Sequence, residues 1–288
     1  MGMEPITARA WAKLNLTLDV LGKRSDGYHD LCMVMQSVAL CDTVTIEETG
    51  ELGIRVSSNL EFLPSGKNNL ATAAALRLSE AAGRDGNGLR ITLDKSIPVC
   101  AGMGGGSSDA AAVLRALNEG WKLGWSREEL ARVGEKVGSD VPYCVLGGTA
   151  LAEGRGEILT PLPALPWCIA VLCKPRFSIS TPELFSRIDG MKVTCRPDTK
   201  GILTALERGD VQGVARRMYN VFEDVLPRNQ AGTIAEIKGV LIQHGALGAC
   251  MSGTGPTVFG LFDSLVAAWR AFHELKAVYP ETFLTVTI

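Results

Sequence analysis

Apolar and polar residues alternate along the segment from Ala10 to Val20. Its even-numbered positions are all apolar, whereas the odd-numbered positions include Lys13 and Asn15. Because successive side chains of a β-strand point to opposite faces, this pattern predicts a strand with one face toward the core. Lys13 and Asn15 then project together from the other face, which we expect to be exposed. An isolated lysine on such a face can also be simply solvated.

Three further elements are predicted in the first half of the chain: an alanine-rich helix over residues 68–82, a strand over 89–93 and a helix over 107–118. In the last of these, apolar residues recur at i, i+3, i+4 and i+7, the spacing of one helix face. Ser126 and Glu129 form a capping box, which predicts the start of another helix that ends at Gly138.

A proline-rich passage separates the two halves. Pro161, Pro163 and Pro166 punctuate it, so we place a domain boundary there, with residues 1–160 and 161–288 on its two sides. The second domain is predicted to contain a strand over 168–173, several helices, strands over 247–252 and 257–262, a last helix and a closing strand over 283–288. This mixture predicts an α/β or α+β protein with two lobes.

Composition excludes several classes of protein. With 29 Lys and Arg against 31 Asp and Glu, the 288-residue chain has a formal net charge of -2 and no concentrated basic segment, so we expect no nucleic-acid partner. The longest apolar stretches have about seven residues, far fewer than the roughly 18 that cross a bilayer. We therefore expect no membrane partner, and the N-terminal residues resemble neither an export signal nor a lipid anchor.

The eight cysteines are scattered among apolar neighbours, without a Cys-x-x-Cys pair or a histidine at metal-binding spacing. We therefore expect reduced core thiols in a cytoplasmic protein, and no metal site built from protein ligands.

Glycines gather in the segment from Pro98 to Asp109, between a predicted strand and a predicted helix. Four of the five residues from Gly102 to Gly106 are glycine, and Ser107 and Ser108 follow. Glycines let backbone N–H groups converge on an anion, and a helix N-terminus favours negative charge, so the segment predicts a phosphate-binding loop. It has neither the Gly-Lys-Ser/Thr ending of a P-loop nor the spacing of a dinucleotide fingerprint. The alternative is a glycine turn in which Ser107 caps the helix.

Asp140 precedes a proline by two residues. Because Pro142 disfavours helix at Val141, we expect Asp140 to lie at a break in the chain, where its carboxylate can face a cleft. The alternative is that Asp140 caps the next turn. Paired with a lysine, the carboxylate would stay ionised and could accept a proton from a substrate hydroxyl, and Lys13 is the candidate partner.

Two other loops are candidates for ligand binding. The turn-rich loop from Gly22 onward ends in Tyr28 and His29, which offer a stacking surface and a hydrogen-bonding ring for a heterocycle. The second glycine turn, residues 251–259, is either a simple tight turn between strands or a loop that closes over phosphates or substrate.

Together these motifs resemble the GHMP kinases, whose hallmark is a glycine- and serine-rich phosphate loop. The resemblance covers about residues 10–262 in the same order, through residues 12–16 and 27–29, the loop at 98–108, the segment 138–142, the segment 148–161 and the turn at 252–255. It implies a small-molecule kinase with an N-terminal ATP-binding lobe, a C-terminal ferredoxin-like lobe and an active site in the cleft between them. Within the superfamily the motifs are most similar to kinases of a cytidyl-diphosphate sugar alcohol in isoprenoid precursor synthesis.

The resemblance also implies roles for individual residues. Lys13 and Asp140 would be catalytic. Asn15, Tyr28, His29 and Phe185 would bind substrate, with the base between Tyr28 and Phe185. The ATP-binding residues would be Lys95, Pro98, Val99, Cys100, Ala101, Gly102, Met103, Gly104, Gly105, Gly106, Ser107 and Ser108.

The implied cofactor is ATP, with Mg²⁺ carried by the nucleotide, and the chain would be a monomer or a homodimer. Asp109 is ambiguous, because an anion so near the phosphates repels them unless it meets the metal or complements the helix end. Two other functions explain part of the pattern: a GHMP kinase for a small alcohol such as homoserine or mevalonate, and a nucleotide-binding sensor without turnover.

Overall fold

The computed structural model describes residues 3–64, 66, 68–191 and 193–288. They form two compact units. The N-terminal unit takes the described residues of Met1–Ala12, Cys41–Val99 and Gly104–Gly147, and the C-terminal unit takes Lys13–Leu40, Cys100–Met103 and Gly148–Ile288. The long strands β1 (Ile6–Lys23) and β2 (His29–Glu48) contribute residues to both. The units are interleaved along the chain, and the domain boundary at 160/161 stays a prediction.

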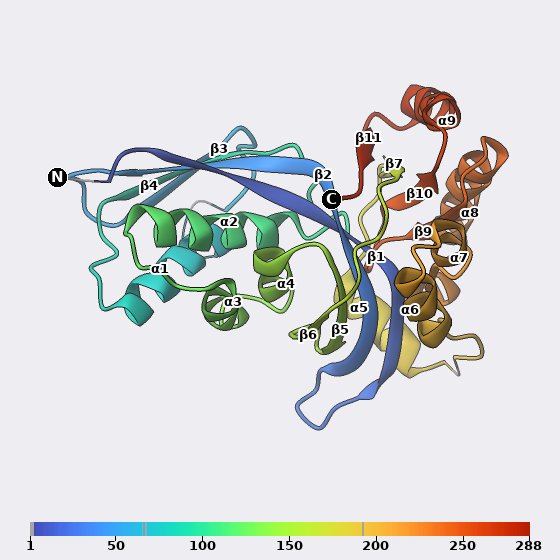
Figure 1. Ribbon diagram of the computed structural model, residues 1–288, viewed down its shortest axis with the longest axis horizontal. Coiled ribbons are helices and arrows are strands. Elements are labelled where there is room, and N and C mark those ends of the chain that lie inside the picture. Colours follow the sequence, from blue (N-terminus) through green and yellow to red (C-terminus); the bar gives the residue numbers. More distant parts are fainter. Residues whose placement is uncertain (1–2, 65, 67, 192) are drawn as a thin grey trace. The chain divides into compact units, whose positions relative to one another are not determined.

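Helices cover one side of the strands in the N-terminal unit. There β3 (Ile54–Ser58) pairs in parallel with β4 (Leu89–Asp94), and β4 pairs antiparallel with residues 43–48 of β2. Figure 1 shows the helices together on one side of these strands; they are α1 (Leu70–Ala82), α2 (Gly105–Gly120), α3 (Arg127–Glu135) and α4 (Val141–Leu146). Residues of β4 alternate between buried and exposed, so their apolar side chains join the helices in one core.

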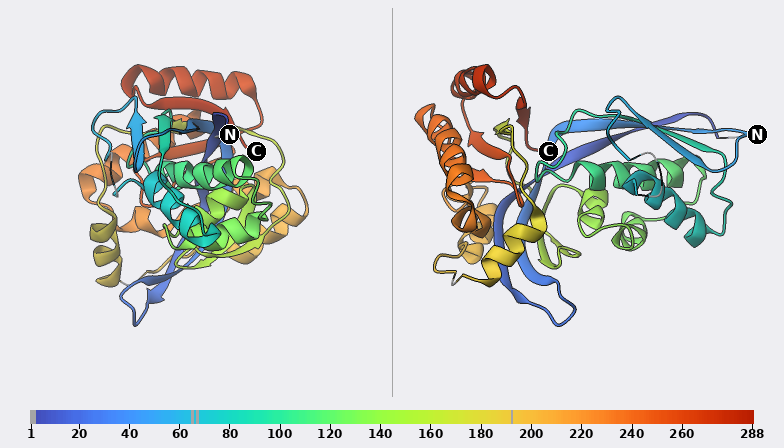
Figure 2. Two further views of the ribbon diagram at one scale, coloured as in Figure 1. Left: turned by 90° about the vertical axis from the view of Figure 1, so that its left-hand side faces the viewer. Right: turned by 180° about the vertical axis from the view of Figure 1, so that it is seen from behind.

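The C-terminal unit contains a four-stranded antiparallel sheet in the order β11-β7-β10-β9. Its strands are β7 (Ile169–Cys173), β9 (Gly248–Met251), β10 (Val258–Phe262) and β11 (Thr282–Val286). The helices α8 (Arg228–Gln243) and α9 (Leu265–Val278) lie along one side of it (Figure 2, orange and red). This β-α-β-β-α-β sequence is the predicted ferredoxin-like arrangement.

Shorter elements complete the C-terminal unit. The strand β5 (Thr149–Gly154) pairs with residues 31–36 of β2 and with β6 (Ile158–Pro161), and β8 (Tyr219–Asn220) pairs in parallel with residues 17–18 of β1. Between β7 and α8 the chain forms α5 (Thr181–Asp189), α6 (Thr199–Glu207), α7 (Val211–Ala215) and a 3₁₀ helix over Val221–Val225. Across residues 3–64, 66, 68–191 and 193–288, no helix is long and apolar enough to span a membrane.

The predicted α/β class is confirmed. The elements predicted by residue range are present, with corrections at their ends, whereas β2, β3, α4, β5 and β6 were not predicted from the sequence. The capping box at Ser126 and Glu129 forms, but its helix ends at Glu135 instead of Gly138. The helix predicted from Ser107 begins at Gly105, inside the glycine segment. The expectation of core thiols is wrong for Cys100 and Cys195, which are exposed.

Candidate active site

Positive φ values occur at every second residue of the glycine segment from Cys100 to Gly104. Cys100, Gly102 and Gly104 have φ values of 53°, 75° and 69°, whereas Ala101 and Met103 between them do not take positive φ. Alternation of left- with right-handed residues is the backbone pattern that turns successive N–H groups toward a bound anion, and positive φ at every second residue is compatible with it. Phosphate binding by this loop stays a prediction.

Neighbouring segments of the C-terminal unit hold the loop by its carbonyl groups. Three hydrogen bonds do this: Thr257 N to Ala101 O (3.3 Å), Ser252 Oγ to Gly102 O (2.9 Å) and Lys13 N to Met103 O (3.1 Å). These bonds use the carbonyl groups of three successive residues. The second glycine turn, between β9 and β10, therefore contacts the glycine segment directly.

Helix α2 begins without a side-chain cap. Its N-cap residue is Gly104, and Ser107 lies inside the helix, so the alternative in which Ser107 caps it is wrong. A helix start without a cap leaves backbone N–H groups for another acceptor, such as a phosphate. The hydroxyl of Ser108 is buried and donates to Trp11 O (2.6 Å), so the partly exposed Ser107 carries the hydroxyl nearer to solvent.

A buried ion cluster underlies the start of α2 in the N-terminal unit. The Lys95 ammonium contacts the carboxylates of Asp42 and Asp109, and all three side chains are at most 5% exposed. Asp42 also accepts hydrogen bonds from the backbone N–H groups of Ser96 (2.6 Å) and Ile97 (2.7 Å). The cluster thus joins the segment that enters the glycine loop to the first turn of α2. Sequence reasoning placed Lys95 near the nucleotide but missed Asp42.

Asp109 carries the unusual electrostatics of this cluster. Burial, together with the nearby Asp42 carboxylate, outweighs the Lys95 ammonium and raises the pKa of Asp109 to about 7. Its Oδ1 atom is buried and has no hydrogen-bond partner. Protonation of Asp109 would give the cluster one cation and one anion, which lowers the repulsion of a phosphate that the sequence analysis noted.

Lys13 and Asn15 lie on one face of β1, as predicted, but that face is covered. Lys13 Nζ donates to Asn15 Oδ1 (2.7 Å), and the two residues are 5% and 0% exposed. Every residue from Ala12 to Val20 is buried, so the expectation that this face is exposed is wrong. Polar side chains can occupy a buried face when hydrogen bonds compensate for the loss of water. Asn15 has two more: its backbone N–H donates to Ser252 Oγ (3.2 Å), and its amide donates to Met33 Sδ (3.2 Å).

Asp140 is the N-cap residue of α4, but its side chain makes no capping hydrogen bond. The alternative that Asp140 serves as a helix cap is therefore wrong. Val141 begins the helix, contrary to prediction, because a proline in the first turn removes only an N–H that has no helical partner. Asp140 belongs to the N-terminal unit and Lys13 to the C-terminal unit, so their pairing stays a prediction.

Two of the predicted base-binding residues, His29 and Phe185, are in contact in the C-terminal unit. The rings of His29 and Phe185 stack with centroids 4.5 Å apart, and Phe222 packs edge-on against Phe185. Tyr28 is 57% exposed, and the Arg155 guanidinium lies 5.2 Å from the centre of its ring. A base between Tyr28 and Phe185 stays a prediction, because in this structure Phe185 stacks on His29.

Sequence reasoning missed Asp189. Its Oδ1 lies 2.6 Å from His29 Nε2, and its Oδ2 accepts a hydrogen bond from Lys23 Nζ at 2.9 Å. These two contacts, Lys23 first, lower the pKa of Asp189, so the carboxylate is ionised near neutral pH. The signal available in the sequence is the four-residue spacing from Phe185, which places both side chains on one face of a helix.

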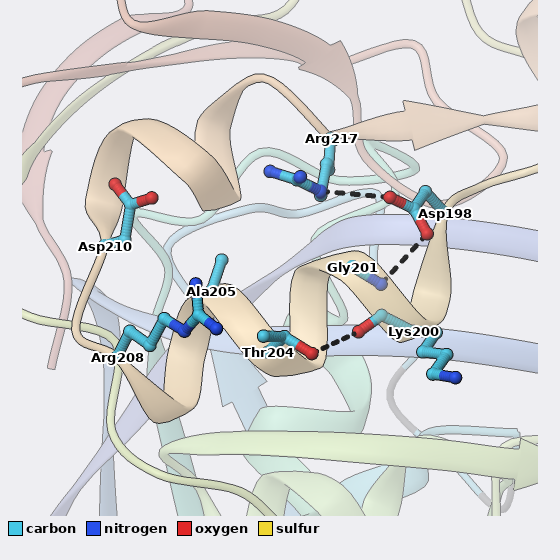
Figure 3. Close-up of a pocket in the computed structure, with 8 residues that line it drawn as sticks. All are labelled: Asp198, Lys200, Gly201, Thr204, Ala205, Arg208, Asp210 and Arg217. Carbon is cyan, nitrogen blue, oxygen red and sulfur yellow. Dashed lines mark hydrogen bonds and ion pairs between the residues drawn. The ribbon is translucent and has the colours of Figure 1, made fainter.

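A separate pocket of about 340 Å³ lies beside α6 and α7 (Figure 3). Its lining residues are Asp198, Lys200, Gly201, Thr204, Ala205, Arg208, Asp210 and Arg217, and none of them is a predicted site residue. Asp198 and Asp210 each accept a backbone N–H at the start of a helix, and Asp198 also binds Arg217. Both carboxylates thus have structural roles.

In the described part of the chain, no three His, Cys, Asp or Glu side chains come together to hold a metal ion.

Comparison with known sequences identifies the family. Residues 69–148 match the GHMP kinases N terminal domain, and residues 202–281 match the GHMP kinases C terminal domain. The chain is 44% identical to the 4-diphosphocytidyl-2-C-methyl-D-erythritol kinase of Alkaliphilus metalliredigens, over 98% of this chain and 96% of the relative. It is 46% identical to the enzyme of that name from Lachnoclostridium phytofermentans, over 98% and 97%. The chain belongs to the GHMP kinases.

Solved structures agree on the fold. A 4-(cytidine 5'-diphospho)-2C-methyl-D-erythritol kinase superposes with a TM-score of 0.82 at 34% identity, over 98% of this chain and 99% of the other. The homoserine kinase of Cytophaga hutchinsonii superposes with a TM-score of 0.76 at 19% identity, over 99% of this chain and 94% of the other. At that identity the second likeness concerns the fold alone.

Gly102→Ala tests the close packing of the glycine segment against Ser252. A Cβ at this position would lie 2.1 Å from Ser252 O, and the residue has positive φ. We expect a loss of about 1–3 kcal/mol in the free energy of unfolding, together with weaker ATP binding, because the loop has to move. Thermal unfolding and nucleotide titration measure both. Gly232→Ala, in α8 with nothing within 4 Å, is the matched control and should not weaken ATP binding. Unchanged behaviour of the Gly102 variant would contradict the close approach.

Asp109→Asn tests the buried cluster. Because the pKa of Asp109 is higher in the folded protein than in the unfolded chain, the folded state binds this proton more tightly. The free energy of unfolding therefore falls as pH rises from about 4 to about 7. We expect the fall between pH 5 and pH 8, measured by urea unfolding, to be smaller in the variant by at least about 1 kcal/mol. Asp94→Asn, on an exposed position of β4, is the control. Equal falls in Asp109→Asn and the unsubstituted protein would refute the raised pKa.

Proposed function

We propose that this protein transfers the γ-phosphoryl group of ATP to the 2-hydroxyl of 4-diphosphocytidyl-2-C-methyl-D-erythritol, giving the 2-phosphate and ADP. This step belongs to the methylerythritol phosphate route to isoprenoid precursors. The observation that carries the proposal is the 44–46% identity, over nearly the whole chain, to relatives that bear the name of this kinase. The ring of Tyr28, which is 57% exposed, gives it further support, because a cytosine needs an aromatic surface on which to stack.

The glycine segment is proposed to hold the phosphates of ATP. Its alternating backbone and the uncapped start of α2 both offer N–H groups to an anion. Lys95 is engaged by Asp42 and Asp109, which supports a role in shaping the loop entry more than in contacting phosphate. Mg²⁺ would be bound mainly by phosphate oxygens, as is usual for this ion with nucleotides, and would neutralise charge that develops during transfer.

Lys13 and Asp140 are proposed to act at the reacting hydroxyl. Phosphoryl transfer passes through a loose transition state that chiefly requires positioning and charge stabilisation. Asp140 would orient the hydroxyl and accept its proton, and Lys13 would keep that carboxylate ionised and stabilise the substrate oxygen. Asn15, which accepts a hydrogen bond from Lys13 Nζ, would fix the ammonium and bind the substrate next to it.

The opposite end of the substrate is proposed to lie near residues 28–29 and α5. Tyr28 is sufficiently exposed to stack on a base, and Arg155 beside its ring adds positive charge near the place where a diphosphate would follow. His29 would hydrogen-bond the edge of the base while Tyr28 stacks on its face, and Phe185, which packs on His29, would hold that ring.

A coupled assay of ADP formation with ATP, Mg²⁺ and the cytidyl alcohol tests the proposal. We expect turnover with this alcohol. We expect none with homoserine or mevalonate, because neither has a base that can stack on the aromatic side chains. Protection by CMP or CDP is a second expected result. Turnover with homoserine or mevalonate, without protection by CMP or CDP, would favour another GHMP kinase activity. Tight ATP binding without ADP formation from any alcohol would favour a sensor.

Lys13→Met and Asp140→Asn test the catalytic pair. Each removes one charge with little change in volume, and we expect turnover to fall at least about 100-fold while ATP still binds. Steady-state kinetics and nucleotide titration separate the two effects. Asp94→Asn removes an exposed carboxylate of the N-terminal unit and should leave turnover unchanged. Variants of Lys13 or Asp140 with normal turnover would exclude that residue from catalysis.

Tyr28→Ala tests the stacking role. Loss of a base stack is expected to weaken binding of the cytidyl alcohol by about 1–3 kcal/mol, a magnitude taken from base–aromatic stacking in nucleic-acid complexes. The effect should appear in KM and in CDP affinity more than in kcat. Tyr28→Phe retains the ring and should bind nearly as well as the unsubstituted protein. Full affinity in Tyr28→Ala would remove the stacking role.

A further inference from the structure

Helix α5 holds the His29 ring from two directions. Phe185 stacks on its face, and the Asp189 carboxylate approaches Nε2 at 2.6 Å. Phe185 and Asp189 are four residues apart on α5, so one helix face supplies both contacts. His29 is 8% exposed and is the first residue of β2, which fixes its backbone as well. The ring is therefore held in place and in orientation.

The contact with Asp189 also decides which ring nitrogen carries the proton. An ionised carboxylate can only accept hydrogen bonds, so the Nε2 that faces Asp189 must carry hydrogen. In a neutral imidazole the other nitrogen, Nδ1, is then an acceptor. Lys23, which contacts the second carboxylate oxygen of Asp189, keeps the carboxylate ionised. The arrangement Lys23–Asp189–His29 therefore selects one tautomer.

A fixed acceptor distinguishes the two common pyrimidines. Cytosine carries an amino donor at C4, whereas uracil carries a carbonyl acceptor there. An imidazole Nδ1 without a proton can accept a hydrogen bond from the cytosine amine, but it faces a second acceptor if the base is uracil. Sites that hydrogen-bond a substrate group reject analogues that leave a buried partner unsatisfied far more strongly than apolar pockets reject a change of size.

We infer that Asp189 is a positioning residue that sets the base specificity of this kinase. It holds His29 in the tautomer whose Nδ1 accepts a hydrogen bond from the C4 amine of cytosine, a bond that the C4 carbonyl of uracil cannot make. The inference rests on the proposed function for the presence of a cytidyl group. It assigns a role to Asp189 and Lys23 that neither the kinase reaction nor the phosphate loop requires.

CDP and UDP binding, measured by calorimetry, tests the inference without turnover. The unsubstituted protein should bind CDP at least about 100-fold more tightly than UDP. In Asp189→Asn the side chain can present either an amide N–H or a carbonyl to Nε2, so both tautomers become accessible. We expect the ratio of the two affinities to fall at least about 10-fold, through weaker CDP binding. In the kinase assay KM should rise with little change in kcat, since Asp189 does not touch the reacting groups.

Nitrogen NMR of the imidazole rings gives a readout that a merely structural role would not change. The chain has three histidines, so His29→Gln assigns the His29 signals. We expect a protonated Nε2 and an unprotonated Nδ1 in the unsubstituted protein, and a mixture in Asp189→Asn. Glu183→Gln is the matched control, because it removes a carboxylate from the same helix that pairs with Arg187 and not with His29. It should change neither the tautomer nor the CDP/UDP ratio.

Two results would overturn the inference: equal affinity for CDP and UDP in the unsubstituted protein, or an Asp189→Asn variant that keeps both the CDP preference and the single tautomer. Failure of the proposed function has a different signature. In that case CDP would be preferred over UDP and the preference would depend on Asp189, but no phosphoryl transfer to the cytidyl alcohol would be found.

Discussion

The hydroxyl of Ser252 joins three segments: the glycine turn after β9, the proposed phosphate loop and β1. It donates to Gly102 O at 2.9 Å and accepts from Asn15 N at 3.2 Å, so the glycine turn after β9 holds both the loop and β1. The approach is so close that a Cβ on Gly102 would collide with the backbone of Ser252. Since only the carbonyl side of the loop is used in these contacts, its N–H side can serve a ligand. The proposed anion site would thus be made from neutral groups.

Charged side chains near this loop are also held by partners inside the protein. Lys95 lies between two carboxylates, and Lys13 donates to Asn15. Buried charges are costly unless they are paired and hydrogen-bonded, so such arrangements restrict each group to one position. Preorganised groups of this kind suit phosphoryl transfer, in which placement and electrostatics contribute most of the rate.

Sequence reasoning was sufficient where local pattern determines structure. Alternation along β1, the capping box before α3 and the glycine segment each gave the observed element, because their causes lie within a few residues. The strand β2 was missed, since its middle residues, from Met33 to Val38, are buried on both faces and show no alternation. For the same reason the face of β1 that carries Lys13 was wrongly expected to be exposed: what covers a strand face is decided by distant segments.

The partners of the candidate residues were also beyond the reach of local pattern. Asp42 is 53 residues from Lys95, and Asp189 is 160 residues from His29. No spacing rule connects such pairs. The resemblance to GHMP kinases supplied the candidate residues, and the structure added the groups that hold them in place: Ser252 for the loop, Asp42 and Asp109 for Lys95, and Asp189 for His29.

Hydrogen exchange of backbone amides, with and without a non-hydrolysable Mg·ATP analogue, tests the central claim most directly. If residues 100–108 hold the nucleotide through their N–H groups, the analogue should slow exchange across this segment at least about 10-fold, while amides of the ferredoxin-like sheet change little. Saturating nucleotide that leaves the exchange of residues 100–108 unchanged would contradict the account.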